Sequence, residues 1–293
     1  CSGWRLASAV SNEGGLGLIG SASMCPEVLD EHIVKCKKAT DKPFGVNIAL
    51  LYPQIQEHIK IILKHKIKIV FSSAGNPVKF TSILKENGII VVHVVSNLRF
   101  AKKAVDAGVD AIVAEGFEAG GHNGKDEMTT MSLIPLVKKE IKIPIIAAGG
   151  IASGQAILAA FSLGAEGVQI GSLFASSEES SAHNNFKKAI VDAAENDTIL
   201  TLKELAPVRL LKNPFYQKIF DAYQKGASAE QLKKLLGRGR AKKGIFEGDL
   251  DEGELEIGQV SAQIEEIKSV KKIMQEIITD FNSTKIALNN FDF

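Results

Sequence analysis

One histidine stands in a glycine-rich loop, where its side chain could take or give a proton. The loop reads EAGGHNG and contains Glu118, Gly120, Gly121 and His122. Glycines let the backbone lie flat against a planar ligand and leave the neighbouring imidazole accessible. An imidazole titrates close to neutral pH, which suits general acid–base catalysis. A histidine in a solvated loop is the alternative interpretation, and we predict His122 as the catalytic residue.

Two glycine turns suggest a second kind of chemistry, the binding of a phosphate group. Gly149 and Gly150 end the segment IPIIAAGG, and Gly171 with Ser172 lies inside GVQIGSLF. Backbone N–H groups in such turns can approach an anion, and a helix beginning near Ser153 would add the positive end of its dipole. Either pair alone could be an ordinary tight turn. Together, after two consecutive predicted strands, they favour a phosphate cradle.

The other histidines are weaker candidates. His32, His58 and His65 lie among lysines on helical patterns, which predicts surface positions. His93 alternates within a strand, so it lies either inside a barrel or in a packed core, and the core position is favoured. His183 could line the pocket or cap the next helix, and the sequence does not decide between the two.

Short apolar strands alternate with amphipathic helices through the first two thirds of the chain. The strands lack polar alternation, which is typical of parallel strands covered on both faces. They begin every 22–32 residues, the spacing of β–α units, so a doubly wound sheet and a (β/α)8 barrel both fit. The predicted strands cover residues 16–20, 44–48, 67–73, 89–95, 111–116, 143–149 and 167–174.

We predict an α/β protein with a (β/α)8 TIM barrel whose first strand is missing from this chain. Seven strands are visible, and the opening WRLASAVSNEGG reads as a helix that should follow a strand. The longest interval between strands places extra residues 117–128 directly after the fifth visible strand. Loops at the C-terminal ends of barrel strands carry the chemistry of such folds. The loop that holds His122 is therefore a site candidate on position alone.

From about residue 197 the β–α rhythm stops. The pattern predicts helices over 203–237 and a final amphipathic helix over 259–281, with basic GRGRAKKG and acidic EGDLDEGELEIG between them. We therefore predict a cofactor-binding barrel over residues 1–196 and a helical appendage over 197–293 that packs on it.

Composition argues against several classes of protein. Lys and Arg total 35 and Asp and Glu total 34, which gives a net charge of +1, and aromatic residues make up 6%. This balance disfavours a nucleic-acid-binding surface. No apolar run approaches the roughly 18 residues that a membrane helix needs. Cys1, Cys25 and Cys36 form no CxxC pair, which suits a reducing cytoplasm and predicts neither a disulfide framework nor a metal site.

The motifs, taken in order, resemble a known family. They are SAVSNEGGLGLIG, DKPFGVNI, AEGFEAGGHNG, IPIIAAGGIASG and LGAEGVQIGSLF, and EGELEIGQVSAQI follows near the C-terminus. The chain resembles the FMN-dependent nitronate monooxygenases, formerly called 2-nitropropane dioxygenases. It is also similar to the flavin-type enoyl-[acyl-carrier-protein] reductases, which share the fold, particularly in TTM (129–131). The likeness is strongest over residues 1–190.

The resemblance implies which residues hold the flavin and do the chemistry. Asn47 matches an asparagine near the flavin ring, and Glu115 stands where many members have glutamine. His122 matches the proposed catalytic base, and Ser172 replaces a more usual threonine while keeping the hydroxyl. The opening strand of the family and its GGM-like flavin contact have no counterpart here. The implied cofactor-binding residues are Asn47, Glu115, Gly120, Gly121, Gly149, Gly150, Gln169, Ile170, Gly171 and Ser172.

The resemblance also implies a cofactor and a reaction. The cofactor is FMN, and the reaction is the oxidation of alkyl nitronates or nitroalkanes by dioxygen to carbonyl compounds and nitrite. One alternative is an enoyl-[acyl-carrier-protein] reductase that uses NAD(P)H as co-substrate. Two others are a truncated, non-catalytic fragment of an FMN barrel and a phosphate-binding isomerase without flavin, although the isomerase does not explain Asn47 and EAGGH together.

The expected partner is a small-molecule substrate, either a nitronate or an enoyl thioester, with no nucleic acid and no membrane. A homodimer and an acidic carrier protein are the macromolecular partners considered. A carrier protein would dock on the basic residues of the appendage, which are more simply read as a solvated face balanced by nearby carboxylates. These residues are Lys233, Lys234, Arg238, Arg240, Lys242 and Lys243.

Overall fold

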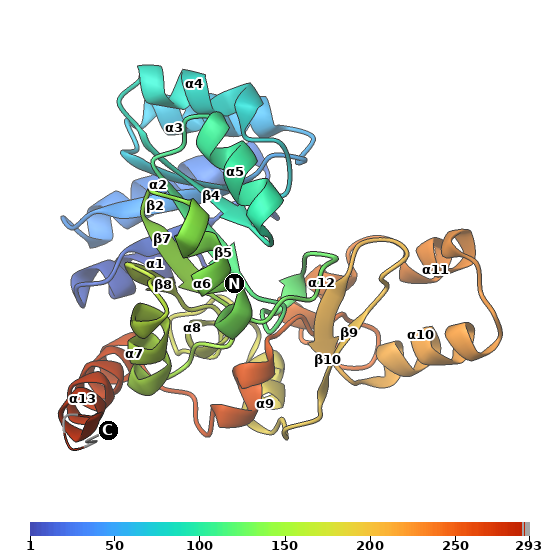
Figure 1. The fold of residues 1–293 in the computed structure, drawn as a ribbon. Coiled ribbons are helices and arrows are strands. Elements are labelled where there is room, and N and C mark those ends of the chain that lie inside the picture. The colour runs from blue at the N-terminus through green and yellow to red at the C-terminus, as the bar shows by residue number, and fades with distance from the viewer. Residues whose placement is uncertain (289, 291–293) are drawn as a thin grey trace.

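Seven parallel strands form one curled sheet in the computed structural model, which describes residues 1–288 and 290 (Figure 1). The strands lie in the sheet in chain order, and β1 and β8 form its two edges. The sheet is one strand short of a closed barrel, as the sequence predicts. The strands are β1 (Gly17–Gly20), β2 (Phe44–Ala49), β3 (Ile69–Ser73), β4 (Ile90–Val95), β5 (Ala111–Glu115), β7 (Ile145–Ala148) and β8 (Gly167–Gln169).

The strands bury both of their faces, which is why they read as continuous apolar runs. Val46 and Ile48 of β2 lie in the large cluster beneath the helices. Phe71 of β3 and Val113 of β5 belong to a smaller cluster on the inner face. Because successive side chains of a strand point to opposite faces, Asn47 points to the inner face.

Helices follow the strands and cover the outer face of the sheet. Asn97, Thr129 and Ser153 begin three of them, since each side chain accepts a hydrogen bond from the backbone N–H three residues later. Gly88 and Gly108 follow two helices with φ of +68° and +82°, the left-handed conformation predicted there. The helices are α1 (Trp4–Asn12), α2 (Pro26–Ala39), α3 (Ile55–Lys64), α4 (Val78–Glu86), α5 (Leu98–Asp106), α6 (Thr130–Glu140) and α7 (Gly154–Ser162).

The last helix, α13 (Val270–Leu288), returns to the barrel and lies beside α7 and α1 (Figure 1). Its residues Val270 and Ile273 pack in one apolar cluster with Leu6 of α1. The carboxylate of Asp280 accepts a hydrogen bond from the backbone N–H of Gln155 at 2.9 Å. The C-terminal helix therefore fastens the helices that flank the two edge strands.

A second, antiparallel sheet lies between the barrel and the helices over residues 214–236 (Figure 1). Its order is β6 (Gly121–His122), β10 (Val208–Leu211) and β9 (Thr198–Thr201). Because β6 belongs to the loop after β5, this sheet joins that loop to the C-terminal appendage. The predicted division of the chain into two parts at residue 196 stays a prediction. The remaining elements are α8 (Ser172–Ala175), α9 (Asn184–Val191), α10 (Pro214–Gln224), α11 (Ala229–Leu236), α12 (Arg240–Ile245) and the 3-10 helix η1 (Gln259–Gln263).

Three predictions about the extent of helices and strands are wrong. The strand predicted over 167–174 ends at Gln169, because the chain turns at Gly171 and starts a short helix. The C-terminal region is helical, but β10 interrupts the helices expected over 203–237, since VRLL is buried throughout and pairs on both edges. The final helix begins at Val270 rather than near residue 259. No helix in the described part of the chain is long and apolar enough to span a membrane.

Candidate active site

Polar side chains gather where the barrel strands end. Asn47 of β2 and Ser73 of β3 both lie on the inner face, half-buried, and the Asn47 amide donates to Ser73 Oγ at 3.5 Å and to the carbonyl oxygen of Phe71 at 3.4 Å. Gln169 ends β8 on the same face, because Val168 beside it packs toward the helices. The C-terminal ends of barrel strands are the usual place for catalysis in this fold.

β5 ends in a carboxyl group. Glu115 alternates with Ala114, which packs beneath the helices, so its side chain points into the barrel. Desolvation raises the pKa of Glu115 to about 7. Burial therefore favours the protonated form more than in an ordinary glutamate, and that form can donate as well as accept a hydrogen bond. In its protonated form Glu115 offers an O–H donor beside an acceptor oxygen, and so imitates in part the glutamine that the resemblance implies at this position.

The two glycine turns lie near one another because β7 and β8 are neighbours in the sheet. Gly149 and Gly150 have φ of +88° and +71°, a conformation that is costly for any residue that carries a Cβ. A Cβ on Gly149 would lie 2.7 Å from the carbonyl oxygen of Gly116. At Gly171 a Cβ would meet no described atom within 4 Å. The first turn is thus packed against the β5 loop, whereas the second is open to a ligand.

The loop after β5 is fastened to the start of α6. Both carboxylate oxygens of Glu118 accept hydrogen bonds from the backbone N–H of Thr130, at 3.0 and 3.1 Å. The hydroxyl of Thr130 lies within 3.2 Å of the same carboxylate. This threonine belongs to TTM, the segment that resembles the enoyl reductases, and its contacts give it a structural role at the base of the loop.

The segment of residues 254–259 packs over the same loop. Gly120 approaches it so closely that a Cβ would lie 2.5 Å from the nitrogen of Gly258. The Gln259 N–H donates to the Glu118 carbonyl oxygen at 2.9 Å, and the Gly258 N–H donates to Ser172 Oγ at 3.0 Å. The C-terminal region therefore ties the loop after β5 to the turn after β8.

His122 lies on β6, where it pairs with Val208 of β10. Its side chain is 71% exposed, and Nδ1 is 3.9 Å from a carboxylate oxygen of Glu256. No hydrogen bond within residues 1–288 joins this imidazole to Asn47 or Glu115. The structure therefore brings His122 to Glu256, while the other predicted site residues gather at the strand ends and glycine turns.

A family model described as nitronate monooxygenase matches the chain over residues 1–61 and 53–280. The chain belongs to the nitronate monooxygenase family. This confirms the resemblance that the motifs carry, and it supports a flavin-dependent oxidoreductase. A probable nitronate monooxygenase of Staphylococcus saprophyticus is 33% identical, with 73% of this chain and 74% of that protein covered.

Two further relatives extend the comparison beyond that enzyme. FabK from Thermotoga maritima has a solved structure that is 42% identical, with a TM-score of 0.94 and with 99% of this chain and 92% of that chain covered. A Mycobacterium tuberculosis protein is 27% identical over 95% of this chain and 89% of its own length. It is described as (3aS,4S,5R,7aS)-5-hydroxy-7a-methyl-1-oxo-octahydro-1H-indene-4-carboxyl-CoA dehydrogenase.

In this member of the nitronate monooxygenase family, sequence reasoning missed a buried arginine. Arg209 of β10 is 3% exposed, its Nε donates to the carbonyl oxygen of Phe117 at 3.0 Å, and its guanidinium lies over the Phe117 ring. It thereby holds the loop after β5 from the appendage side. The sequence signal for this buried arginine was a single charged residue inside the otherwise apolar run VRLL.

Sequence reasoning also missed the carboxyl pair beside His122. Glu254 and Glu256 alternate with Leu255 and Ile257, both of which are buried in the cluster around α9. Desolvation raises the pKa of Glu254 and of Glu256 to about 7, and the charge of Glu256 raises that of Glu254 further. The alternation of polar and apolar residues in ELEI (254–257) was a visible signal that one side of this segment is apolar and the other polar.

The remaining histidines have structural surroundings. His93 is buried and hydrogen-bonded to Ser72 at 2.8 Å, in the packed core as favoured. His183 caps α9, where its Nδ1 accepts from the N–H of Asn185. His58 is fully buried, which corrects the predicted surface position, because its helix faces the loop after β1 rather than solvent at that residue.

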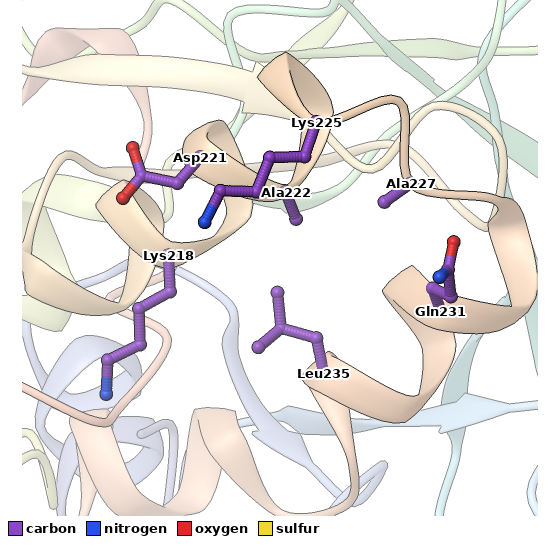
Figure 2. Close-up of a pocket in the computed structure, with 7 residues that line it drawn as sticks. All are labelled: Lys218, Asp221, Ala222, Lys225, Ala227, Gln231 and Leu235. Carbon is purple, nitrogen blue, oxygen red and sulfur yellow. The ribbon is translucent and has the colours of Figure 1, made fainter.

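A groove with a volume of about 420 Å³ lies between α10 and α11 (Figure 2). Figure 2 shows Lys218 and Asp221 of α10 and Lys225, which directly follows it, beside the groove, with Leu235 of α11 opposite. None of the predicted site residues lines this groove. It therefore contributes nothing to the candidate active site at the strand ends.

Proposed function

We propose that this protein is an FMN-dependent nitronate monooxygenase, which oxidises alkyl nitronates or nitroalkanes with dioxygen to carbonyl compounds and nitrite. The observation that carries the proposal is the position of His122 on the loop after β5, beside a carboxyl group and tied to the barrel mouth, in a chain of this family. A nitroalkane is oxidised only after its α-carbon loses a proton, so an accessible base is what the substrate needs.

The residues at the strand ends fit FMN. Gly149 and Gly150 both have positive φ, which glycine tolerates best, and Gly171 leaves its turn open, so backbone N–H groups of these turns would hold the phosphate of FMN. Asn47 and Gln169 would hydrogen-bond the ring from the inner face, and Glu115 would do so as donor or acceptor. When bound, FMN takes electrons from the substrate and passes them to dioxygen.

The protein's own contribution is proton transfer and charge control. His122 would accept the α-proton of a neutral nitroalkane, or hold a nitronate anion when it is itself protonated. Because desolvation raises the pKa values of Glu115, Glu254 and Glu256 to about 7, these carboxyls carry less negative charge near neutral pH than ordinary carboxylates do. They therefore oppose an anionic substrate less than ordinary carboxylates would.

Reduction of an enoyl thioester is the second candidate. The specific observation in its favour is the 42% identity with FabK over almost the whole chain, since that likeness fits the enoyl reductase side of the resemblance. NAD(P)H would then be the co-substrate, and an acidic carrier protein could present the thioester. However, Arg240, Lys242 and Lys243 of the basic run already pair with carboxylates of the chain itself.

Anaerobic mixing of the FMN-loaded protein with each electron donor separates the two candidates. We expect a nitronate to bleach the flavin absorbance and NADPH alone to leave it unchanged. Rapid bleaching by NADPH followed by reoxidation with an enoyl thioester would assign the reductase instead. Protein that stays colourless after incubation with FMN would contradict both.

A further inference from the structure

Two carboxyl groups of one short segment lie on the side that faces His122. Leu255 and Ile257 are buried away from it, in the cluster formed with α9. Glu254 feels the charges of both Glu256 and His122, so the two carboxyl groups and the imidazole share one electrostatic neighbourhood. Glu254 is 7% exposed and the Glu256 side chain 18%, against 71% for His122.

Gly121 makes room for this contact. It has a φ of +76°, and a Cβ built on it would lie 3.0 Å from Glu256 Oε2, tighter than ordinary contact. The pairing of β6 with β10 fixes the backbone of His122 at Val208. The imidazole is therefore placed with Nδ1 toward Glu256 Oε1, at 3.9 Å, while most of the ring faces solvent.

We propose that Glu256 is a positioning residue for His122, holding the Nδ1 side of the imidazole so that Nε2 is the nitrogen presented to the substrate. The carboxylate favours a proton on the nearer nitrogen, as carboxylates do for histidines that ligate metals or act in catalytic triads. Nε2 then carries the free lone pair that takes the α-proton. The substrate's identity rests on the proposed function, but the orientation of the ring does not.

The tautomer of His122 tests the positioning role directly. Heteronuclear NMR of protein labelled with 15N-histidine distinguishes the Nδ1–H form from the Nε2–H form, and His122→Asn identifies the signals. At pH 8.5, above the pKa of about 7 of Glu256, we expect the Nδ1–H form in the wild type and a shift toward Nε2–H in Glu256→Ala.

Glu254→Ala is the matched control, because it removes a buried carboxyl of the same segment with a similarly raised pKa. It should leave the tautomer unchanged, since among the carboxylates of the described residues only that of Glu256 lies within 4.0 Å of an imidazole nitrogen of His122. An unchanged tautomer in Glu256→Ala, or an equal shift in both variants, would overturn the proposal.

Kinetics give a second readout that separates this inference from the proposed function. Glu256→Ala should lower kcat about 10- to 100-fold, the usual cost of losing a residue that orients an active histidine, with KM and FMN content unchanged. A change in KM alone would contradict positioning. If neither nitronates nor enoyl thioesters are turned over by the wild type, the proposed function fails, while the NMR experiment still decides the role of Glu256.

Discussion

The hydroxyl of Thr130 donates to the carbonyl oxygen of Gly149 at 2.8 Å, and thereby joins the first turn of α6 to the end of β7. The same hydroxyl lies 3.0 Å from the carbonyl oxygen of Ala148. Together with the bonds from the Thr130 N–H to Glu118, these contacts connect the loop of His122 to one of the two glycine turns.

Thr130→Val should loosen this connection, because valine keeps the shape and loses the hydroxyl. We expect a loss of about 1–3 kcal/mol in the free energy of unfolding, since buried acceptors lose their partner. FMN affinity should fall as well. Thr129→Ala is the control, because the Thr129 side chain only caps α6. This substitution should lower the free energy of unfolding by about 1 kcal/mol without weakening FMN binding. Chemical denaturation and flavin titration measure both effects, and equal FMN affinity in the two variants would contradict the prediction.

His122→Asn should lower turnover of a neutral nitroalkane by about 10²–10⁴-fold, the usual contribution of a general base. FMN should remain bound, because no described contact makes His122 part of the glycine turns. His183→Asn is the control, since asparagine can also cap α9. Oxygen consumption with nitroethane and with its nitronate measures the effect. Wild-type turnover in His122→Asn would remove the base role.

Gly150→Asp should abolish FMN binding, because the new side chain would occupy space in the turn and its carboxylate would repel the phosphate. Gly226→Asp is the control for the backbone cost, because Gly226 has the same φ of +71° and lies between α10 and α11, whereas only at Gly150 would the new Cβ also lie 3.5 Å from the Glu118 carboxylate. In both variants the free energy of unfolding should fall by about 1–2 kcal/mol, because a side chain is placed at positive φ. Only Gly150→Asp should lose the flavin absorbance, so FMN retained in it would count against the phosphate cradle.

Glu115 should make folding stability depend on pH. Its pKa is about 7 in the folded protein against 4.5 as the ordinary value, so the folded state binds more protons between these values. Stability therefore falls as pH rises from about 4.5 to 7, by up to about 3 kcal/mol from this group. Glu115→Gln should be more stable than the wild type at pH 8 and similar at pH 4. Urea unfolding at both pH values checks this, and an equal difference at both would contradict it.

The barrel was predictable because its determinants are local. Buried strands such as 44–48 and 89–95 read as apolar runs, and helix ends such as Gly88 and Gly108 carry residues suited to a left-handed turn. The glycines of EAGGHNG were likewise visible, since close backbone approach demands them. The family followed from these motifs taken in order.

What the sequence did not reveal depends on contacts between distant segments. Nothing local shows that VRLL pairs with the loop of His122, so β10 was expected to be helical. Glu256 becomes a partner of His122 only when residues more than a hundred positions apart meet. His58 looked like a surface residue because lysines surround it, yet its side chain turns under the loop after β1.

The position of α13 bears on how this chain acquires its structure during synthesis. Val270 and Ile273 lie in one apolar cluster with Leu6, so this part of the interior cannot form until the ribosome has synthesised the chain through residue 273. Contacts of such long sequence separation slow folding. Until then the apolar sides of the flanking helices lack this cover, and transiently exposed apolar surface of this kind makes partly folded chains prone to aggregation.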